Sequence, residues 1–421
     1  MKFIEHLKTP EDRTFWRMRF NGIEKFDHLS KPCIVFNVAS LGELNGAIPV
    51  ASVLRKLGFS GTIVLSVGTP TAYRRANSPD LSALQLIALP APLENPRSIS
   101  TFIRYVQPDL FVNFEAEYWP MLFAGLRDSN VPTILVNGRI SKKAFLFYNL
   151  FYKVFSPVFR QFIRLGMVSR THCERAVKLG ANPKSVHVTG SSKYDNLMVR
   201  CHQKNNLFRW QQLLQIDPRF PVIVAGNLRG WECDLIVKTI KKLTEDFPNT
   251  LAILAPRHLH RVSEIAKKAS VLGIKNCLMS DLINGRVTSS RKFTVIIVDC
   301  FGILFELYGV ADITFCGGTF APIGGHNIVE PAVWGKKVLY GPFVHKIERE
   351  HEVLQKWGIG ILCGTPDDLL IRLKSELASG DRHKLTLPQN VTESAIKELS
   401  GASRIYASWV MELMKERRGK S

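Results

Sequence analysis

The segment 311–335 brings together residue types that could bind a phosphorylated ligand. A short apolar run ends in Gly317-Gly318, a loop follows, and Gly324-Gly325-His326-Asn327 leads into a predicted helix. Glycines allow the backbone to approach a ligand closely, and the unpaired N–H groups at a helix start attract anions. We therefore expect a phosphate-binding loop. Its candidate contacts to a sugar-nucleotide are Gly325, His326, Asn327 and Glu330. Glu330 also stands three residues after Asn327, which is the spacing of a helix capping box, so a capping role is open as well.

A second candidate, Glu43, lies in Ala39-Ser-Leu-Gly-Glu-Leu44, directly after the first predicted strand. A carboxylate at the carboxyl end of a strand is well placed to act as a general base, and partial burial would raise its pKa. The spacing Ser-x-x-Glu is also that of a capping box, in which Ser40 caps a helix and Glu43 supports the cap. The pattern alone favours the capping role and leaves the catalytic role open.

Other charged residues follow further predicted strands of the first half. Glu115 and Glu117 are two residues apart, so only one of them can face a ligand if the segment is extended. Arg139 and Lys142 belong to a basic loop that could hold phosphates by charge-assisted hydrogen bonds. A solvated surface loop is an equally good interpretation of these two cations.

Short apolar runs alternate with helical patterns along most of the chain. These runs are 33–37, 62–66, 110–113 and 133–137 in the first half, and 222–225, 251–255, 295–298 and 313–316 in the second. Apolar strands that are each followed by a turn and a helix predict parallel sheets covered on both faces. We therefore expect an α/β protein with two Rossmann-like domains. The expected division is an N-terminal domain 1–200, a linker 201–215, a second domain 216–395, and a C-terminal helix with a basic tail at 396–421.

Two facing domains of this kind would share a ligand site in the cleft between them, because open α/β sheets bind ligands beyond the carboxyl ends of their strands. Arg257 and His258 follow a strand of the second half and suit a nucleotide phosphate. Singly, such residues are most often surface charge. The prediction of a site depends on many such loops meeting at one edge.

The net charge of +20 indicates an acidic partner. The basic residues are spread along the chain without a zinc-finger or RNA-binding signature, which favours an anionic membrane or a phosphorylated lipid over nucleic acid. No stretch has the length of a signal-peptide core or of a membrane span, so we expect a soluble or peripheral protein.

The aromatic segment 144–155 is predicted to be a helix that lies in the core or in a membrane interface. The eight scattered cysteines indicate reduced thiols.

An ordered set of motifs resembles the 3-deoxy-D-manno-oct-2-ulosonic acid (Kdo) transferases of lipopolysaccharide synthesis. The motifs are ASLGE (39–43), TPT (69–71), EAEYWP (115–120), NGRIS (137–141), LGANPKSVHVTGSSKYD (179–195), PRH (256–258), FCGGTFAPIGGHNIVEPA (315–332) and YGP (340–342). The resemblance runs from about residue 33 to about residue 360, and GGHNIVEPA is its strongest piece.

The resemblance implies a GT-B fold with an acceptor-binding domain first and a nucleotide-binding domain second. It implies CMP-Kdo as donor, the lipid A precursor lipid IVA as acceptor, and inverting transfer without a metal or another cofactor. It also implies a peripheral protein at the cytoplasmic face of the inner membrane. The family's catalytic base falls on Glu43. On the acceptor side we assign Glu115, Glu117, Arg139 and Lys142, and on the donor side Lys193, Arg257, His258, Gly325, His326, Asn327 and Glu330, with Glu330 as the ribose ligand.

The chain also departs from the family pattern. Where the family has Asp-Thr-Met-Gly-Glu-Leu, this chain has Asp299-Cys-Phe-Gly-Ile-Leu304, so Ile303 replaces a carboxylate. Asn37 stands where the family tends to have histidine, and the hydrophobic N-terminal anchor of the family is not found. Two alternatives therefore stay open: another GT-B nucleotide-sugar transferase or epimerase, and a catalytically decayed protein that binds a membrane surface.

Overall fold

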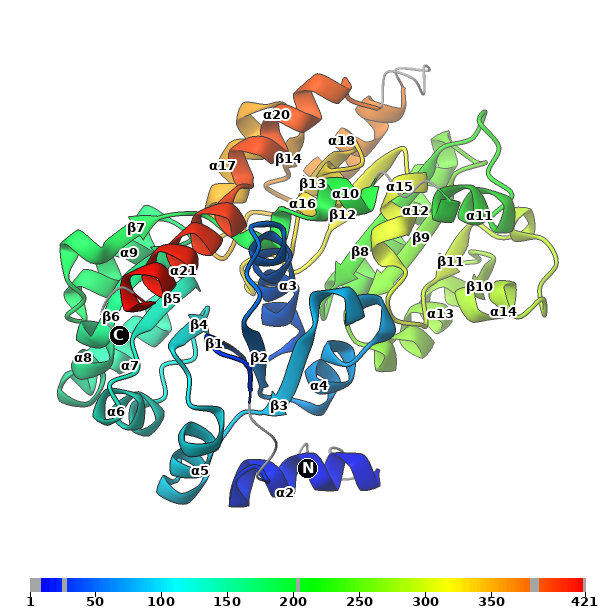
Figure 1. Ribbon diagram of the computed structural model, residues 1–421. Helices are drawn as coiled ribbons and strands as arrows, with labels where there is room; N and C mark the ends of the chain where they lie inside the picture. The colour runs from blue at the N-terminus through cyan, green and yellow to red at the C-terminus, as the bar shows by residue number, and fades with distance from the viewer. Residues whose placement is uncertain (1–8, 25–28, 202–204, 379–385, 419–421) are drawn as a thin grey trace. The chain divides into compact units, whose positions relative to one another are not determined.

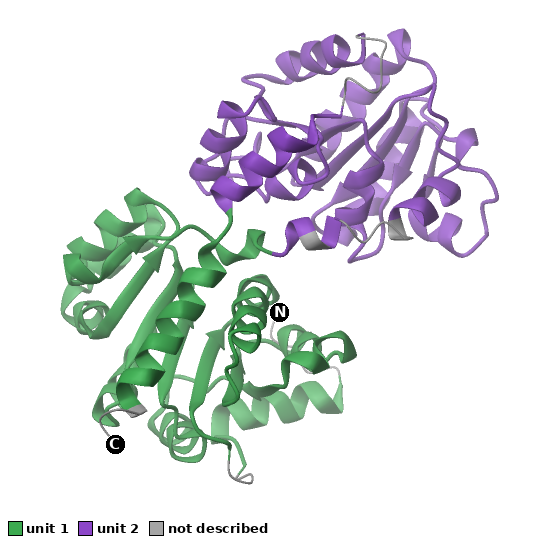
Figure 2. Ribbon diagram, turned by 45° about the horizontal axis from the view of Figure 1, so that its top comes forward, with its two compact units in different colours: residues 1–195, 400–421 green, residues 196–399 purple. Residues whose placement is uncertain are grey.

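The chain forms two compact units in the computed structural model, which describes residues 9–24, 29–201, 205–378 and 386–418. One unit contains residues 1–195 together with 400–421, and the other contains residues 196–399 (Figure 2). The end of the chain therefore belongs with the first unit. The domain ranges predicted above stay a prediction, because compactness alone defines these units. The predicted basic tail lies in part outside the described residues, and so do the first eight residues of the chain.

The first unit is built on a seven-stranded parallel sheet with the order β3-β2-β1-β4-β5-β6-β7 (Figure 1). Its strands are β1 (Cys33–Val38), β2 (Thr62–Val67), β3 (Leu86–Pro90), β4 (Leu110–Phe114), β5 (Thr133–Gly138), β6 (Phe162–Met167) and β7 (Val186–Val188). The four strands predicted in the first half are β1, β2, β4 and β5, so these predictions are confirmed.

Helices cover both faces of this sheet. They are α2 (Pro10–Asn21), α3 (Leu41–Lys56), α4 (Pro70–Ala76), α5 (Pro96–Val106), α6 (Pro120–Asp128), α7 (Lys142–Leu150), α8 (Tyr152–Gln161), α9 (Arg170–Lys178) and α21 (Ala402–Arg418). Alternate side chains of β1 point to opposite faces, as in any strand. Ile34, Phe36 and Val38 join an apolar cluster with α3, α4 and α21. Cys33 and Val35 join a second cluster with α5, α6 and α8.

The last helix, α21, is fastened to the first unit by polar contacts at two points. The backbone N–H groups of Gly401 and Ser403 both donate to the carboxylate of Asp195, at 2.6 Å each. Further along, the buried hydroxyl of Tyr406 accepts from the backbone N–H of Asn137 at 3.0 Å and lies 2.5 Å from the hydroxyl of Thr189. These contacts tie the end of the chain to the carboxyl end of β5.

The second unit repeats the architecture with a seven-stranded parallel sheet in the order β10-β11-β9-β8-β12-β13-β14. Its strands are β8 (Val222–Leu228), β9 (Leu251–Pro256), β10 (Asn276–Leu278), β11 (Val295–Ile297), β12 (Ile313–Cys316), β13 (Lys337–Tyr340) and β14 (Gly360–Leu362). Its helices are α10 (Leu197–Cys201), α11 (Asn205–Leu213), α12 (Glu232–Asp246), α13 (Val262–Val271), α14 (Met279–Ile283), α15 (Leu304–Val310), α16 (Val329–Ala332), α17 (Glu348–Lys356), α18 (Pro366–Leu377) and α20 (Gln389–Leu399). The four predicted strands of the second half, now β8, β9, β11 and β12, are confirmed, and so is the α/β fold class.

The aromatic segment 144–155 is not the single helix that we predicted. It is divided between α7 and α8, because Phe151 leaves the helical conformation with φ −102° and ψ 38°. Its aromatic side chains face in two directions. Phe145, Tyr148 and Phe155 pack against the core, whereas Phe147 lies on the outside and is 53% exposed. Within the described residues, no helix combines the length and the apolar character needed to cross a membrane.

Both sheets reverse their strand order once, and this reversal marks the expected ligand site. The order reverses between β1 and β4 in the first unit and between β8 and β12 in the second. In open parallel sheets the crevice outside the carboxyl ends at this switch point is where ligands bind. Glu43, Glu115 and Glu117 follow β1 and β4, and the glycine loop follows β12.

We predict that Tyr406→Phe lowers the free energy of unfolding by about 1–3 kcal/mol, because it leaves a buried N–H of Asn137 without its acceptor. Urea denaturation followed by tryptophan fluorescence measures the change. Tyr152→Phe, at a tyrosine 37% exposed to solvent, is the matched control and should alter stability by less than about 0.5 kcal/mol. Equal effects of the two substitutions would contradict the structural role of the Tyr406 hydroxyl.

Candidate active site

A row of hydrogen-bonded polar side chains lies across the carboxyl ends of β2, β1 and β4. Ser66 Oγ donates to Asn37 Oδ1 at 3.0 Å, and Asn37 Nδ2 donates to Asn113 Oδ1 at 2.9 Å. Asn113 in turn donates to the backbone carbonyl of Glu117 at 3.0 Å. All three side chains are buried, so the row fixes the loop after β4 against the end of β1. Asn37, which departs from the family pattern, thus links β2 and β4 through β1, a role that its sequence position did not predict.

Glu43 occupies the first turn of α3, beside this row. Ser40 caps the helix by accepting the N–H of Glu43 at 3.3 Å, and the Glu43 carboxylate accepts the N–H of Ala39. The Ser40 cap predicted from Ser-x-x-Glu is therefore present, but the Glu43 carboxylate binds the N–H of Ala39 instead of that of Ser40, so the capping box is incomplete. Glu43 is buried, with 7% of its surface exposed. Burial, and then the neighbouring carboxylates Glu115 and Glu117, raise the pKa of Glu43 to about 8. A carboxylate with such a pKa can accept a proton near neutral pH.

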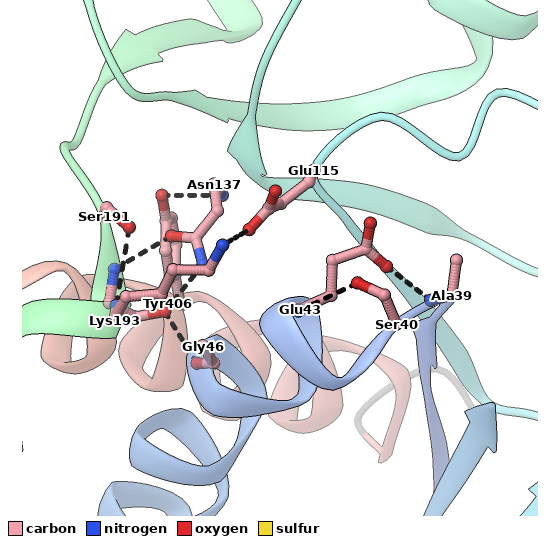
Figure 3. A network of polar contacts seen from close by, with 10 residues as sticks. Ala39, Ser40, Glu43, Gly46, Glu115, Asn137, Ser191, Lys193 and Tyr406 are labelled. Atoms are coloured by element: carbon pink, nitrogen blue, oxygen red, sulfur yellow. Dashed lines mark hydrogen bonds and ion pairs between the residues drawn. The ribbon is translucent and has the colours of Figure 1, made fainter. Parts of the chain in front are cut away.

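Glu115 and Lys193 form an ion pair next to Glu43, as Figure 3 shows. Lys193 was predicted among the donor-side residues, and the structure places it in the first unit, on the short helical turn Ser192–Tyr194. The charge of Lys193 favours the ionised form of Glu43, so it partly offsets the rise that burial causes in the pKa of Glu43. The three side chains come from three separate segments of the chain, and the fold brings them to one switch point.

Glu117 points to a different set of partners from Glu115. Its carboxylate accepts the indole N–H of Trp119 at 2.5 Å, and burial raises its pKa. A cavity of about 20 Å³ lies here, lined among others by Arg19, Asn37, Ala39 and Glu117. Arg19 is buried as well, and it donates to the backbone carbonyls of Gly68 and Ala91. Arg19 was not predicted, because a single arginine in an N-terminal helix carries no sequence signal.

Arg139 lies on the loop after β5 and Lys142 is the first residue of α7, and their surroundings differ. Arg139 is half-buried near the imidazole of His172, whose pKa is lowered to about 4 by burial and then by the charge of Arg139. Lys142 is exposed at the first turn of α7. The structure therefore brings Glu43, Glu115, Glu117 and Lys193 close together, and adds Arg139 through the backbone bond from its N–H to Glu115.

In the second unit, the predicted phosphate-binding loop is already filled by a side chain. The carboxylate of Glu232 accepts the backbone N–H groups of residues 318, 319, 320 and 321 at 2.7–3.1 Å. These four N–H groups are therefore not free to bind a phosphate, and the assignment of Gly325, His326, Asn327 and Glu330 to a phosphorylated ligand stays a prediction. Glu232 follows Arg229 by three residues and accepts its N–H at 2.9 Å. This local contact gives no sequence signal for the four bonds to residues 318–321, which are far away in the chain.

His326 lies at the centre of a group of cations. Its Nε2 is 3.4 Å from Nε of Arg229, and burial together with the charges of Arg257 and Arg229 lowers its pKa to about 4. Lys346 and His258 act on it in the same direction. A neutral imidazole surrounded by cations forms a positively charged environment that suits an anion. Arg257 and His258 are exposed.

Glu330 and Asn327 bond to each other, but not in the capping geometry that their spacing suggests. Asn327 Nδ2 donates to Glu330 Oε1 at 3.0 Å, and Asn327 Oδ1 accepts the N–H of Val329 at 3.1 Å. The helix that follows, α16, has only four residues and therefore gives a weak dipole. Burial raises the pKa of Glu330, and the charge of Arg200 and the bond from Asn327 oppose this rise.

Two further predictions concern metals and Ile303. Among the described residues, no three His, Cys, Asp or Glu side chains form a group that could hold a metal ion. Independence of metal stays a prediction. Ile303 packs against an apolar cluster of the second unit that includes Leu307 and Tyr308. The exchange of a carboxylate for isoleucine at this position is therefore compatible with a packed structure.

The raised pKa of Glu43 should make the free energy of unfolding depend on pH. Between about pH 4.5 and 8 the folded protein keeps a proton on Glu43 that the unfolded chain loses, so this group lowers stability progressively as the pH rises. Glu43→Gln has no proton to lose. We expect the variant to gain on the order of 1–3 kcal/mol over the wild type between acidic and alkaline pH, as measured by urea denaturation across this range.

The exposed Glu174→Gln is the control for this measurement, and it should show no such trend with pH. A stability difference between Glu43→Gln and the wild type that stays constant across the pH range would show that the pKa of Glu43 is not raised.

Comparison with known proteins places these features in a family. Residues 14–196 match the family described as 3-deoxy-D-manno-octulosonic-acid transferase. The chain is 32% identical over 351 residues to the 3-deoxy-D-manno-octulosonic acid transferase of Aquifex aeolicus, covering 83% of this chain and 87% of that protein. It is 29% identical to the transferase of the same name from Haemophilus influenzae, covering 73% and 70% of the two chains.

Solved structures support the fold. A glycosyltransferase from Rickettsia africae superposes with a TM-score of 0.64 and 14% sequence identity. The match covers 93% of this chain and 100% of that chain. A UDP-GlcNAc 2-epimerase from Neisseria meningitidis superposes with a TM-score of 0.61 and 14% sequence identity. The match covers 90% of this chain and 100% of that chain. The two Rossmann-like units are those of the GT-B fold, as predicted. With its identity to the Aquifex transferase over most of both proteins, the chain belongs to the 3-deoxy-D-manno-octulosonic acid (Kdo) transferases, a family of glycosyltransferases.

Proposed function

We propose that this protein transfers Kdo from CMP-Kdo to a hydroxyl of the lipid A precursor lipid IVA, with inversion at the anomeric carbon. The observation that carries the proposal is the buried carboxylate of Glu43, whose pKa is about 8, beside the Glu115–Lys193 ion pair at the switch point of the first sheet. Such a carboxylate, once ionised, can act as a general base that takes the proton of an acceptor hydroxyl.

In this reaction, Glu43 removes the proton of the acceptor hydroxyl while the oxygen of that hydroxyl bonds to the anomeric carbon of Kdo. The bond between that carbon and the phosphate oxygen breaks, and CMP leaves with the electron pair. Lys193 is paired with Glu115 beside Glu43, and because its ammonium has three donors it can also bind the carboxylate of the incoming Kdo. We assign Lys193 to that contact, which keeps it among the donor-binding residues.

The donor's nucleotide is assigned to the second unit. Arg257, near the neutral ring of His326, supplies positive charge for the phosphate, which gains negative charge as CMP leaves. We assign His258 to a hydrogen bond with the same nucleotide. Gly325 has φ +93°, and a Cβ there would lie 2.5 Å from Ile347, so only glycine fits this turn. Asn327 orients the carboxylate of Glu330, for which we propose a contact to the ribose hydroxyls.

The acceptor is assigned to the first unit. Arg139 and Lys142 are proposed to bind the phosphates of lipid IVA, because guanidinium and ammonium groups form charge-assisted hydrogen bonds to phosphate oxygens. Glu115 and Glu117 are proposed to contact the sugar hydroxyls. Glu115 can do so while it stays paired with Lys193, because a carboxylate accepts several hydrogen bonds.

We further propose that α7 and α8 attach the protein to the cytoplasmic face of the inner membrane as a peripheral protein. No side chain of α7 is fully buried. Leu146, Phe147 and Leu150 are 59%, 53% and 77% exposed, and Val154 of α8 is 50% exposed. Such an apolar surface on a chain with a net charge of +20 suits an interface with anionic lipids.

The catalytic role of Glu43 is tested by Glu43→Gln. We expect at least about a thousandfold loss of single-turnover transfer from radiolabelled CMP-Kdo to lipid IVA, because the base is lost, while CMP binding measured by calorimetry is retained. For the wild type, kcat/KM should rise with pH up to about 8 as Glu43 ionises.

The control for this test is again Glu174→Gln, which should transfer at the wild-type rate. Near-normal transfer by Glu43→Gln would overturn the role of Glu43. A wild type that gives no product would instead favour a decayed, non-catalytic protein, the alternative that Ile303 suggests. Preference for UMP over CMP in calorimetry would indicate a different donor.

Membrane attachment is tested by Phe147→Glu combined with Leu150→Glu. Two charges in the exposed apolar surface should weaken binding to anionic phospholipid vesicles about tenfold or more in a sedimentation assay. Val271→Glu, at a 74% exposed valine of α13, adds the same kind of charge to the second unit and should have little effect. Equal loss in both proteins would show that α7 is not the attachment surface.

A further inference from the structure

The carboxylate of Glu232 is held more completely than any other acidic group named above. Its side chain is fully buried, and it accepts five backbone hydrogen bonds. Four come from the glycine loop, and the donors are the N–H groups of Gly318 (2.7 Å), Thr319 (2.9 Å), Phe320 (2.8 Å) and Ala321 (3.1 Å). The fifth comes from Arg229 at 2.9 Å. A buried carboxylate is tolerated when donors of this kind compensate its charge.

This arrangement resembles an anion held in a cradle of backbone amides, with the anion supplied by the protein itself. Consecutive N–H groups that point to one centre form a site that loops often use for phosphate. Here they point to Glu232, so a ligand phosphate cannot use them while the carboxylate is in place. The loop has no regular secondary structure to hold it, and these bonds fix its conformation.

The loop and the cations of the candidate donor site are physically joined. Gly318 has φ +72°, and a Cβ on it would lie 2.7 Å from the ring of His326, so the ring packs directly on this glycine. The N–H of Gly325 donates to the carbonyl of Gly318 at 2.8 Å. Arg229, whose N–H is bound by Glu232, extends its guanidinium to His326. Glu232 therefore holds both the surface on which His326 packs and the backbone from which Arg229 extends.

We infer that Glu232 is a positioning residue for donor binding: it takes the place of a phosphate in the loop 318–321 and thereby directs the donor's own phosphate to the side chains around His326. The inference rests on the proposed nucleotide donor. It assigns phosphate binding to the cations Arg229 and Arg257, and it removes the loop amides from that role. Glu232 itself does not touch the donor.

The test compares Glu232→Gln with Asp234→Asn, which removes a charge from the same first turn of α12. An amide at position 232 keeps the size of the side chain but offers one acceptor oxygen in place of two. We expect the dissociation constant for CMP, measured by calorimetry, to rise about tenfold or more in Glu232→Gln and to stay within about twofold in Asp234→Asn. KM for the donor should rise by a similar factor, with a smaller change in kcat.

A merely structural role is distinguished by two further measurements. Hydrogen exchange of the amides 318–321 should accelerate in Glu232→Gln, which reports on the loop itself. In Glu232→Ala, added formate should restore CMP binding, because a small anion can occupy the emptied cradle. Glu232→Asp, which keeps the charge on a shorter side chain, serves if the other variants fail to fold, and it should bind CMP with intermediate affinity.

The outcomes separate this inference from the proposed function. If the wild type binds CMP and Glu232→Gln binds it equally well at a temperature where both are folded, the inference is wrong. If formate leaves CMP binding by Glu232→Ala unchanged, the positioning role is also wrong. If the wild type does not bind CMP, the proposed donor is wrong. In that case, weaker binding of inorganic phosphate by Glu232→Gln than by the wild type would support the positioning role of Glu232, and equal binding would overturn it.

Discussion

The candidate site depends on one constraint, which is that both sheets are parallel and covered on both faces. Strands such as β1 and β8 are buried from end to end, so polar side chains can be placed without cost only where the strands stop. The carboxyl ends at the two switch points are the places where neighbouring loops turn away from each other and leave room for a ligand. Glu43 and Glu232 both lie there, each in the first turn of the helix that follows the first strand of its sheet.

These two glutamates occupy equivalent positions and are treated in opposite ways. Glu232 accepts five backbone N–H groups, which compensate its negative charge and hold it in place. Glu43 accepts the N–H of Ala39, and its burial and then the two carboxylates that it faces raise its pKa. The difference follows from the number of donors around each group. Well-compensated carboxylates organise structure, whereas a poorly compensated one stays available for proton transfer.

The sequence predicted the fold well and the roles of single residues less well. Apolar runs such as 33–37 and 222–225 mark strands because burial on both faces demands them, and the ordered motifs led to the correct family. The glycine pattern predicted a phosphate-binding loop, but it could not show that the amides of residues 318–321 are already bound by Glu232, 86 to 89 residues away in sequence. Lys193 was assigned to the donor on its motif alone, while its pairing with Glu115 depends on how α3, β4 and a short helical turn meet.

Which of Glu115 and Glu117 joins Glu43 could not be read from their spacing, because that argument assumed an extended segment. Glu115 instead adopts φ +59°, a left-handed conformation that costs a residue with a Cβ about 1–2 kcal/mol. Three hydrogen bonds offset this cost: its N–H donates to Val136, and its carbonyl accepts from Arg139 and from the hydroxyl of Tyr118. The turn directs Glu115 to Lys193 and leaves Glu117 to Trp119. A strained backbone residue that persists only because its surroundings hold it is typical of functional sites. The strained turn is therefore the means by which Glu115 is paired with Lys193 beside Glu43, although both Glu115 and Glu117 raise the pKa of Glu43.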